Sequence, residues 1–263
     1  MPETKPTDEN RISPAVLVTG GARRIGAAIV EDLATHGFAV AIHCNGSKKE
    51  ADALAKRLRN NSVEMAVVQA DLTDREAVDG LVAAAADALG RPIQLLLNNA
   101  GLFEADSLMD FDWGDWDRHF RIHLEASVML TRQFAKALPR GVDGLVVNMV
   151  DQRVWKPTPR YFSYALSKAA LWAATRTMAQ ALAPDIRVNA IGPGPTVRND
   201  EQTDAQFAKV VDAVLLRRGP QMSEFGATIR YLWQTRSITG QMIALDGGQH
   251  LAWRTPDATG PGE

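Results

Sequence analysis

The sequence predicts an α/β protein, built as one doubly wound sheet of about seven parallel strands with helices on both faces. Two observations indicate this class. Short runs rich in Val, Ile, Leu and Ala alternate with longer segments that carry apolar residues at helical spacing. The 263 residues also contain neither an internal repeat nor a linker that would divide them, so we expect a single domain over residues 13–253. The polar segments 1–12 and 254–263 are predicted to be mobile tails.

The alternation places each element in order along the chain. The predicted strands span 15–18, 38–42, 63–68, 93–97, 145–149, 186–190 and 241–245. The predicted helices span 24–36, 48–60, 75–89, 113–138 and 161–182. Gly37 and Gly90 stand where a C-cap would end the first and third helices. In such a sheet, ligands bind outside the carboxyl ends of the strands, so the residues after each strand are the candidates for a site.

The composition excludes several kinds of partner. A formal net charge of −2, with 46% hydrophobic residues, gives no general attraction to nucleic acid or to acidic membranes. No apolar run approaches the roughly 18 to 20 residues that span a bilayer. Cys44 is the single cysteine and cannot form an internal disulfide, and the first twelve residues are too polar for a secretory signal. We therefore expect a cytoplasmic protein that binds neither nucleic acid nor membrane.

The first strand leads directly into a glycine turn, Thr19-Gly-Gly-Ala-Arg-Arg-Ile-Gly26, and a helix follows. Small residues at this point let a phosphate approach the backbone, and the unpaired amides of the first helical turn hold it. A glycine turn can also serve only to reverse the chain. Read with the downstream motifs, it predicts a dinucleotide site whose contacts are Gly20, Arg23, Arg24 and Ile25.

The segment after the second strand decides between the two nicotinamide cofactors. Residues 43–48 read His-Cys-Asn-Gly-Ser-Lys, and no carboxylate occurs before Glu50. A carboxylate would repel a 2′-phosphate, whereas Arg24 and a serine hydroxyl can bind one through charge-assisted hydrogen bonds. NADP(H) is therefore favoured. The predicted contacts of this segment are His43, Asn45 and Ser47.

Small or polar residues also follow the third, fourth and sixth strands. They suit contacts with the adenine, the ribose and the nicotinamide, although a helix cap, an ordinary turn or a strand end would use the same residue types. The predicted contacts are Asp71 and Leu72, then Asn99, Ala100 and Gly101, then Pro193 and Gly194.

Tyr164 and Lys168 are four residues apart, so on a helix they project from one face. A free tyrosine has a pKa near 10 and is a slow proton donor at neutral pH. A cation about 4 Å away, at an effective dielectric constant of about 20, is worth roughly 4 kcal/mol, or on the order of three pK units. Lys168 is therefore expected to lower the pKa of Tyr164.

With these motifs, the chain resembles the short-chain dehydrogenase/reductase family over nearly its full length, from the glycine turn to Asp246-Gly247-Gly248. The resemblance implies a Rossmann-type fold, with Tyr164 as proton donor and Lys168 bound to the nicotinamide ribose. It also implies a homotetramer that uses the long helices near 113–138 and 161–182.

Within that family, three positions resemble the pteridine reductases, including bacterial dihydromonapterin reductases. Arg24 replaces a glycine in the pattern TGxxxRxG, Asp151 stands at the usual position of the catalytic serine, and Phe103 falls where those enzymes place a ring against the pterin. A serine hydroxyl donates to a substrate carbonyl, which an ionised aspartate cannot do. Asp151 can instead accept from amino and ring N–H groups, or relay a proton to Tyr164 if its pKa is raised.

Several residues near these motifs have no decided role. His123 lies where most of the family has an asparagine, and a neutral imidazole can donate and accept as that amide does. His119 and His123 have the spacing of a metal pair, but no third ligand accompanies them, so no metal is expected. The aromatic residues Trp155, Tyr161 and Phe162 would either line the substrate pocket or pack in the core or a subunit contact.

The expected function is NADPH-dependent reduction of a dihydropterin at a C=N carbon. Asp151, Tyr164 and Lys168 would control the proton, and the flat ring would lie between Phe103 and the nicotinamide. The expected substrate contacts are Arg24, Phe103, Asp151 and Tyr164. Two alternatives stay open: a carbonyl reductase or alcohol dehydrogenase of the same family, and an NADP-binding sensor without turnover.

Overall fold

A computed structural model describes residues 13–59, 63–198 and 202–253. The predicted tails lie outside the described residues. Seven parallel strands form one sheet in the order β3-β2-β1-β4-β5-β6-β7. The strands are β1 Ala15–Val18, β2 Ala39–Cys44, β3 Met65–Gln69, β4 Ile93–Asn98, β5 Gly144–Met149, β6 Ile186–Pro193 and β7 Met242–Leu245. The predicted fold class is thus confirmed.

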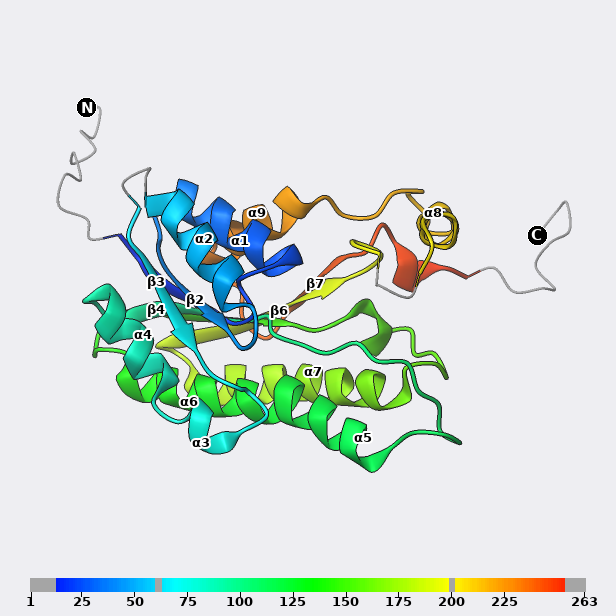
Figure 1. Ribbon diagram of the computed structural model, residues 1–263, viewed down its shortest axis with the longest axis horizontal. Helices are drawn as coiled ribbons and strands as arrows, with labels where there is room; N and C mark the ends of the chain where they lie inside the picture. Colours follow the sequence, from blue (N-terminus) through cyan, green and yellow to red (C-terminus); the bar gives the residue numbers. More distant parts are fainter. Residues whose placement is uncertain (1–12, 60–62, 199–201, 254–263) are drawn as a thin grey trace, which may run out of the picture.

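Helices cover both faces of this sheet (Figure 1). One face carries α1 Arg24–Thr35, α2 Lys48–Arg59 and α9 Met222–Gln234. The other carries α3 Arg75–Val78, α4 Leu81–Leu89, α5 Trp113–Phe120, α6 Ala126–Ala137 and α7 Phe162–Leu182. The central strands are buried on both sides, which explains why they read as continuous apolar runs rather than alternating ones.

The chain reverses direction across the sheet between β1 and β4. From β1 it runs outward through β2 to β3, and from β4 it runs outward the other way to β7. The connections after β1 and β4 therefore diverge at one point, which is where doubly wound sheets bind their ligands.

Three predicted elements differ from the structure. The predicted helix 75–89 is two helices, because Gly80 adopts a left-handed conformation with φ of 77°. The predicted helix 113–138 contains a π-helical turn at Arg121–Glu125. The second strand continues to Cys44, so His43 lies inside it and not in the following loop.

Two helices were not predicted from the sequence: α8 Asp204–Asp212 and α9. Both begin with a capping box, formed by Thr203 with Gln206 and by Gln221 with Glu224. The spacing of these pairs was the available signal. The predicted C-caps are confirmed, since Gly37 and Gly90 both have positive φ just past a helix.

Candidate active site

The glycine turn and the segment after β4 meet between β1 and β4, where the strand order of the sheet reverses. The backbone N–H groups of Asn99 and Ala100 donate to Thr19 Oγ1 at 2.9 and 3.0 Å. A Cβ on Gly20 would lie 2.9 Å from the Cα of Ala100, and one on Gly26 would lie 2.2 Å from the Gly20 carbonyl oxygen. Helix α1 has no side-chain cap and no acidic residue in its first turn. Its N-terminal amides and partial positive charge therefore suit an anion.

The His43 ring on β2 holds the glycine turn in place through a hydrogen bond. The Gly20 N–H donates to His43 Nδ1 at 3.2 Å, and His43 Nε2 lies 3.1 Å from the Ala70 carbonyl oxygen. Because Nδ1 accepts, Nε2 carries the proton and donates to Ala70. Burial lowers the pKa of His43 and keeps the ring neutral. His43, predicted as a cofactor contact, thus uses its ring to position the glycine turn.

Arg23 and Arg24 are both exposed and reach different parts of the site. Arg24 has a φ of 52°, and its Nη2 donates to the carbonyl oxygens of Val197 and Arg198 beyond β6, at 3.5 and 3.2 Å. Arg23 Nη1 lies 3.9 Å from Glu50 Oε1 on α2. Arg23 therefore faces the segment after β2, whereas Arg24 faces the segment after β6.

The remaining predicted contacts of the adenine side lie after β2 and β3. Asn45 is exposed and Ser47 is half-buried. Asp71 accepts hydrogen bonds from the Thr73 N–H and hydroxyl at 2.9 and 2.8 Å, and these bonds lower the pKa of Asp71. Leu72 packs its side chain into the core, so only its backbone is available to a ligand.

Asp71 is not the cap of the following helix. Asp74 holds that position and accepts from the Glu76 N–H.

On the nicotinamide side, Pro193 ends β6 and Gly194 follows it. A Cβ on Gly194 would lie 2.6 Å from the Cα of Asp246. Glycine is needed here because two backbone segments touch. Asp246 in turn accepts from the N–H groups of Gly248 and His250, both at 2.9 Å.

Tyr164 on α7 donates its hydroxyl hydrogen to Asp151 Oδ2 at 2.8 Å. Both residues are 7% exposed. Burial and the neighbouring Asp151 carboxylate hold the pKa of Tyr164 well above 10. The structure therefore differs from the expectation that Lys168 would lower this pKa. The carboxylate touches the hydroxyl itself, whereas Lys168 Nζ lies 5.8 Å from the centre of the ring. Tyr164 therefore stays protonated at neutral pH.

Lys168 lies beneath Tyr164 and donates to the Met149 carbonyl oxygen at 2.7 Å. Burial lowers the pKa of Lys168 to about 8, and the Asp151 carboxylate opposes that shift. Lys168 is thus charged at neutral pH but close to its titration point.

Arg153 is a site residue that the sequence did not indicate. Its Nη1 lies 3.0 Å from Asp151 Oδ2, and its backbone N–H donates to Asp151 Oδ1 at 2.8 Å. Its guanidinium carbon is 5.4 Å from the ring centre of Phe103 and 5.5 Å from that of Tyr161. Those two rings stack at 4.3 Å with an interplanar angle of 17°. No spacing rule joins Arg153 to Phe103, which explains why it was missed.

His123 connects the segment after β4 to α7. Its Nε2 accepts from the Leu102 N–H at 3.1 Å, so Nδ1 carries the proton and donates to Ser167 Oγ at 2.8 Å. The Ser167 hydroxyl in turn donates a hydrogen bond to the Tyr164 carbonyl oxygen at 2.7 Å. Burial and the Lys168 charge hold the pKa of His123 well below its usual range. A Cβ on Gly101 would lie 3.0 Å from this ring, so Gly101 makes room for His123.

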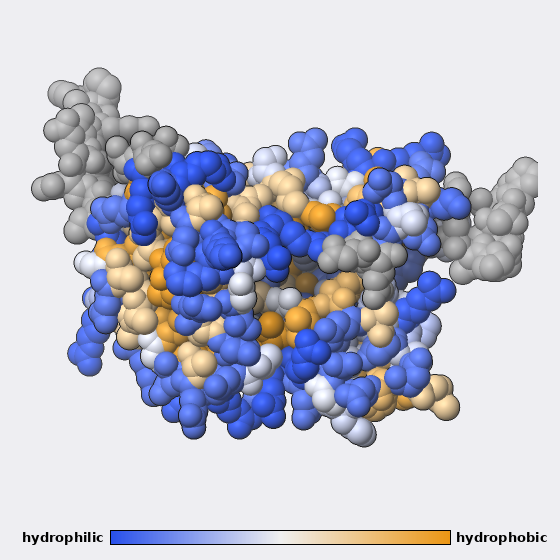
Figure 2. Space-filling view, in the orientation of Figure 1, coloured by the Kyte–Doolittle hydropathy of each residue, from blue (hydrophilic) through white to orange (hydrophobic). Residues whose placement is uncertain are grey.

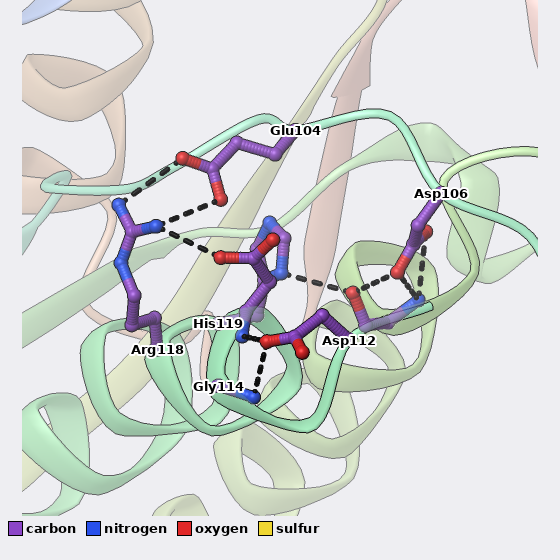
Figure 3. Close-up of polar contacts among 8 residues, drawn as sticks. Glu104, Asp106, Asp112, Gly114, Arg118 and His119 are labelled. Atoms are coloured by element: carbon purple, nitrogen blue, oxygen red, sulfur yellow. Dashed lines mark hydrogen bonds and ion pairs between the residues drawn. The ribbon is translucent and has the colours of Figure 1, made fainter. Parts of the chain in front are cut away.

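A second network ties the same segment to the start of α7 (Figure 3). The Asp106 carboxylate accepts from the Ser163 N–H at 3.1 Å and from the Ser163 hydroxyl. Because that hydroxyl hydrogen goes to Asp106, Ser163 Oγ accepts from His119 Nδ1 at 2.9 Å. The Tyr161 N–H donates to the Asp106 carbonyl oxygen at 2.9 Å. Arg118 binds Glu104 in the same segment.

The other aromatic residues divide between the site and the surroundings. Tyr161 belongs to the site through Phe103. Phe162 packs instead with Trp116, at 6.1 Å between ring centres, and Trp155 packs with His250 at 5.0 Å.

Hydrophobic side chains gather in a band across the middle of the visible face, between the two layers of helices (Figure 2). In the described residues, no helix is long and apolar enough to cross a membrane, and no three His, Cys, Asp or Glu side chains are grouped to hold a metal.

A family model described as short chain dehydrogenase matches residues 14–207. The chain belongs to the short-chain dehydrogenase/reductase family. Short-chain dehydrogenase/reductase FrzI from Cladobotryum is 32% identical over 250 residues, which cover 90% of this chain and 96% of the relative. The 3-oxoacyl-acyl-carrier-protein reductase FabG from Staphylococcus aureus is 27% identical over 246 residues, which cover 92% of this chain and 100% of the relative.

Solved structures give a narrower likeness within the short-chain dehydrogenases/reductases. FolM alternative dihydrofolate reductase 1 from Brucella suis, in complex with NADP, is 59% identical with a TM-score of 0.90, covering 93% of this chain and 98% of that chain. The Brucella canis protein of the same name, complexed with NADP, is 58% identical with a TM-score of 0.91, covering 94% and 98%. A metagenomic blue fluorescent protein in complex with NADPH is 30% identical with a TM-score of 0.82, covering 89% and 97%.

Proposed function

We propose that this chain is an NADPH-dependent reductase of a dihydropterin, acting on a C=N bond of the ring. The observation that supports this most directly is the buried Asp151 carboxylate, which accepts from Tyr164 at the proton-donor position of the site. A carboxylate there favours a substrate that presents N–H groups. The likeness to the two Brucella FolM dihydrofolate reductases supports the same substrate class.

The residues of the site fit NADP(H). The uncapped start of α1 suits the pyrophosphate. Next to it, the backbones of Gly20 and Ala100 lie too close together for a side chain on Gly20. The sequence led us to expect Arg24 and Ser47 at the 2′-phosphate. We assign it instead to Arg23 together with Ser47, because Arg23 faces the segment after β2 and Arg24 does not. Arg24 faces the segment after β6, where a substrate would meet the nicotinamide.

When bound, NADPH supplies the hydride for the C=N carbon. The chain controls the proton. Tyr164 is protonated at neutral pH and would give its proton to the substrate nitrogen. Asp151 accepts from that hydroxyl and orients it, and the Lys168 ammonium compensates the negative charge that develops on Tyr164 as the proton leaves. Phe103 supplies a ring face for a flat heterocycle.

The second candidate is reduction of a carbonyl group, which the FabG relatives perform by name. A carbonyl oxygen needs a hydrogen-bond donor, and the ionised Asp151 cannot be one. Tyr164 alone would then have to donate to the substrate oxygen. A sensor that binds NADP without turnover is the third candidate, although it gives no role to the Tyr164–Asp151 hydrogen bond.

The deciding experiment measures NADPH oxidation with dihydrobiopterin, dihydromonapterin, dihydrofolate and a β-keto ester, for the wild type and for Asp151→Ser. Turnover on a pterin that is lost in the variant supports the proposal. Turnover on the keto ester alone, retained or increased in Asp151→Ser, moves the chain to the carbonyl reductases. NADPH binding without turnover on any of these compounds supports the sensor.

We also propose a homotetramer in the cytoplasm, as the sequence led us to expect. Val128 on α6 and Leu166 on α7 are 40% and 39% exposed, which gives the two long helices apolar surface for a partner subunit. Light scattering after size-exclusion chromatography tests this, and Leu166→Glu should lower the measured mass.

A further inference from the structure

Arg153 contacts both of the features that a flat nitrogen heterocycle would use. Its guanidinium pairs with the Asp151 carboxylate at 3.0 Å and also lies against the Phe103 and Tyr161 rings. Its side chain is 25% exposed, whereas the Asp151 side chain is 9% exposed. Arg153 is therefore at the solvent side of a buried acceptor.

The distances place the guanidinium beside the ring pair. Its carbon is almost equally far from the two ring centres, at 5.4 and 5.5 Å, while those centres are 4.3 Å apart. A group on the outer face of Phe103 would be much farther from Tyr161. Phe103 is 39% exposed, and the Tyr164 ring lies perpendicular to it at 4.8 Å, so a flat ring on the exposed part of Phe103 would also contact Tyr164 and have the guanidinium at its margin.

The acceptor positions of Asp151 are nearly filled by the protein. Oδ1 accepts from the Arg153 N–H, and Oδ2 is shared by the Tyr164 hydroxyl and Arg153 Nη1. A substrate N–H that binds Oδ2 must replace one of these two donors. The Tyr164 hydroxyl leaves Oδ2 only when it turns its proton to the substrate nitrogen, and its ring is buried, whereas the Arg153 side chain is 25% exposed and can turn to solvent. The donor that an incoming substrate displaces is therefore the Arg153 guanidinium.

We propose that Arg153 is a specificity-determining residue, whose guanidinium is an internal ligand of Asp151 that the substrate displaces. This inference rests on the proposed function. A guanidinium is planar and rich in N–H donors, as is the amino-substituted edge of a nitrogen heterocycle. In the free protein the Arg153 guanidinium thus occupies the position on Asp151 that the substrate N–H groups would take. The Arg153 backbone N–H stays on Asp151 during the exchange, because only the side chain turns outward to solvent.

This exchange selects against simple ketones. A substrate with N–H donors replaces the interactions that Asp151 loses, so the buried carboxylate remains satisfied. A ketone offers only acceptors and would leave the carboxylate without its cation, which is costly in a buried site.

The test compares Arg153→Ala with Arg160→Ala, a matched control that removes an exposed arginine of the same connection. Binding of pterin to the enzyme–NADP⁺ complex is measured by calorimetry, and KM for a dihydropterin by NADPH oxidation. We expect Arg153→Ala to bind pterin about fivefold more tightly and to lower KM by a similar factor, since an internal competitor is removed. Arg160→Ala should match the wild type in both quantities.

Methylguanidinium distinguishes competition from a general change in the site. Added at millimolar concentration, it should weaken pterin binding to Arg153→Ala competitively and leave the wild type almost unaffected, whereas tetramethylammonium should have no effect. Equal NADP⁺ affinity and equal melting temperature in both variants confirm that the fold is intact.

Weaker pterin binding by Arg153→Ala would overturn the inference and make Arg153 a direct substrate ligand. Unchanged binding would overturn it as well. Failure of the proposed function appears separately, as a wild type that turns over no dihydropterin, because the calorimetric comparison does not need turnover. Absence of pterin binding by every protein would overturn both.

Discussion

At the scale of single residues, the site is governed by which charge lies closest to Tyr164. Asp151 contacts its hydroxyl directly, and Lys168 is held by the Met149 carbonyl beneath the ring. The negative neighbour therefore outweighs the positive one, and the pKa of Tyr164 rises. Tyr164 therefore keeps its proton at neutral pH but holds it more tightly than a free tyrosine, so its release would depend on the nearby Lys168 charge.

Tyr164→Phe should bind NADPH as the wild type does and lose dihydropterin reduction. Removing a positioned proton donor costs about 10² to 10⁴-fold in kcat. NADPH fluorescence titration and steady-state kinetics check the two halves of this expectation. A variant that keeps more than a tenth of the wild-type kcat would show that another group supplies the proton.

Lys168 should make NADPH binding depend on pH in the range above neutrality. Its pKa is lowered to about 8, so the charged form that attracts the anionic cofactor is lost as pH rises through that value. NADPH Kd, measured by fluorescence at pH 7 and pH 9.5, should increase in the wild type. Lys168→Arg, which stays charged, should show a flatter dependence, and an equally steep one would assign the titration to another group.

The same lowered pKa has the opposite consequence for the stability of the free protein. The unfolded state holds the Lys168 proton more tightly than the folded state, so the stability of the folded protein increases as pH rises from about 8 toward 10.5, the ordinary pKa of lysine. Below pH 8 the buried charge is fully destabilising. Lys168→Met should therefore raise the free energy of unfolding at pH 7 without cofactor, as measured by urea titration.

At the scale of elements, the segment between β4 and α5 is joined to α7 at two places. His123 reaches Ser167 from the π-helical turn, and Asp106 holds the N–H and hydroxyl of Ser163. The Asp106 carboxylate accepts from the free Ser163 N–H in the first turn of α7, as a capping side chain would, although it lies 57 residues earlier in the chain. These two contacts fix the positions of Phe103 and Tyr164 relative to each other.

Asp106→Ala should lower the free energy of unfolding by about 1 to 2 kcal/mol, the usual cost of a lost helix cap. It should also raise KM for the pterin more than it lowers kcat, because the Phe103 segment loses its anchor. Asp110→Ala is the matched control, since Asp110 caps Ser107 within the same segment and does not reach α7. Equal effects from the two variants would contradict the coupling to α7.

At the scale of the whole molecule, one sheet unites the two halves of the cofactor site. The turn after β1 and the segment after β4 come from either side of the reversal in strand order, and Thr19 connects them. A cofactor bound there contacts elements from both halves. It should therefore stabilise the complete fold and not one part of it.

NADPH should raise the melting temperature more than NADH at the same concentration. At about 100 times its Kd, a ligand that binds only the folded state adds ~2.7 kcal/mol. Scanning calorimetry of the wild type and Arg23→Ala checks the assignment of the 2′-phosphate. The variant should lose most of the difference between the two cofactors, whereas Arg24→Ala should keep it, and the reverse result would exchange the roles of the two arginines.

The sequence by itself determined the order of the strands along the chain and the place of the site. Strands buried on both faces are apolar along their length, so β1, β4 and β5 can be recognised in the sequence as short apolar runs. The glycine turn and the Tyr164–Lys168 pair are equally legible, because both depend on local spacing along a turn or a helix. Helices α8 and α9 were overlooked although their capping boxes are local signals.

Only the tertiary structure decided how the charges of the site meet. Arg153 lies beside Phe103 and Tyr161, Arg23 and Arg24 point to opposite sides, and Asp151 contacts the tyrosine that Lys168 was expected to control. Coulomb energies depend on distance and burial, and both are set by how separate segments pack against one another. Residues close in space but far apart in the chain leave no spacing pattern to read, so the direction of the Tyr164 pKa shift and the role of Arg153 became visible only in three dimensions.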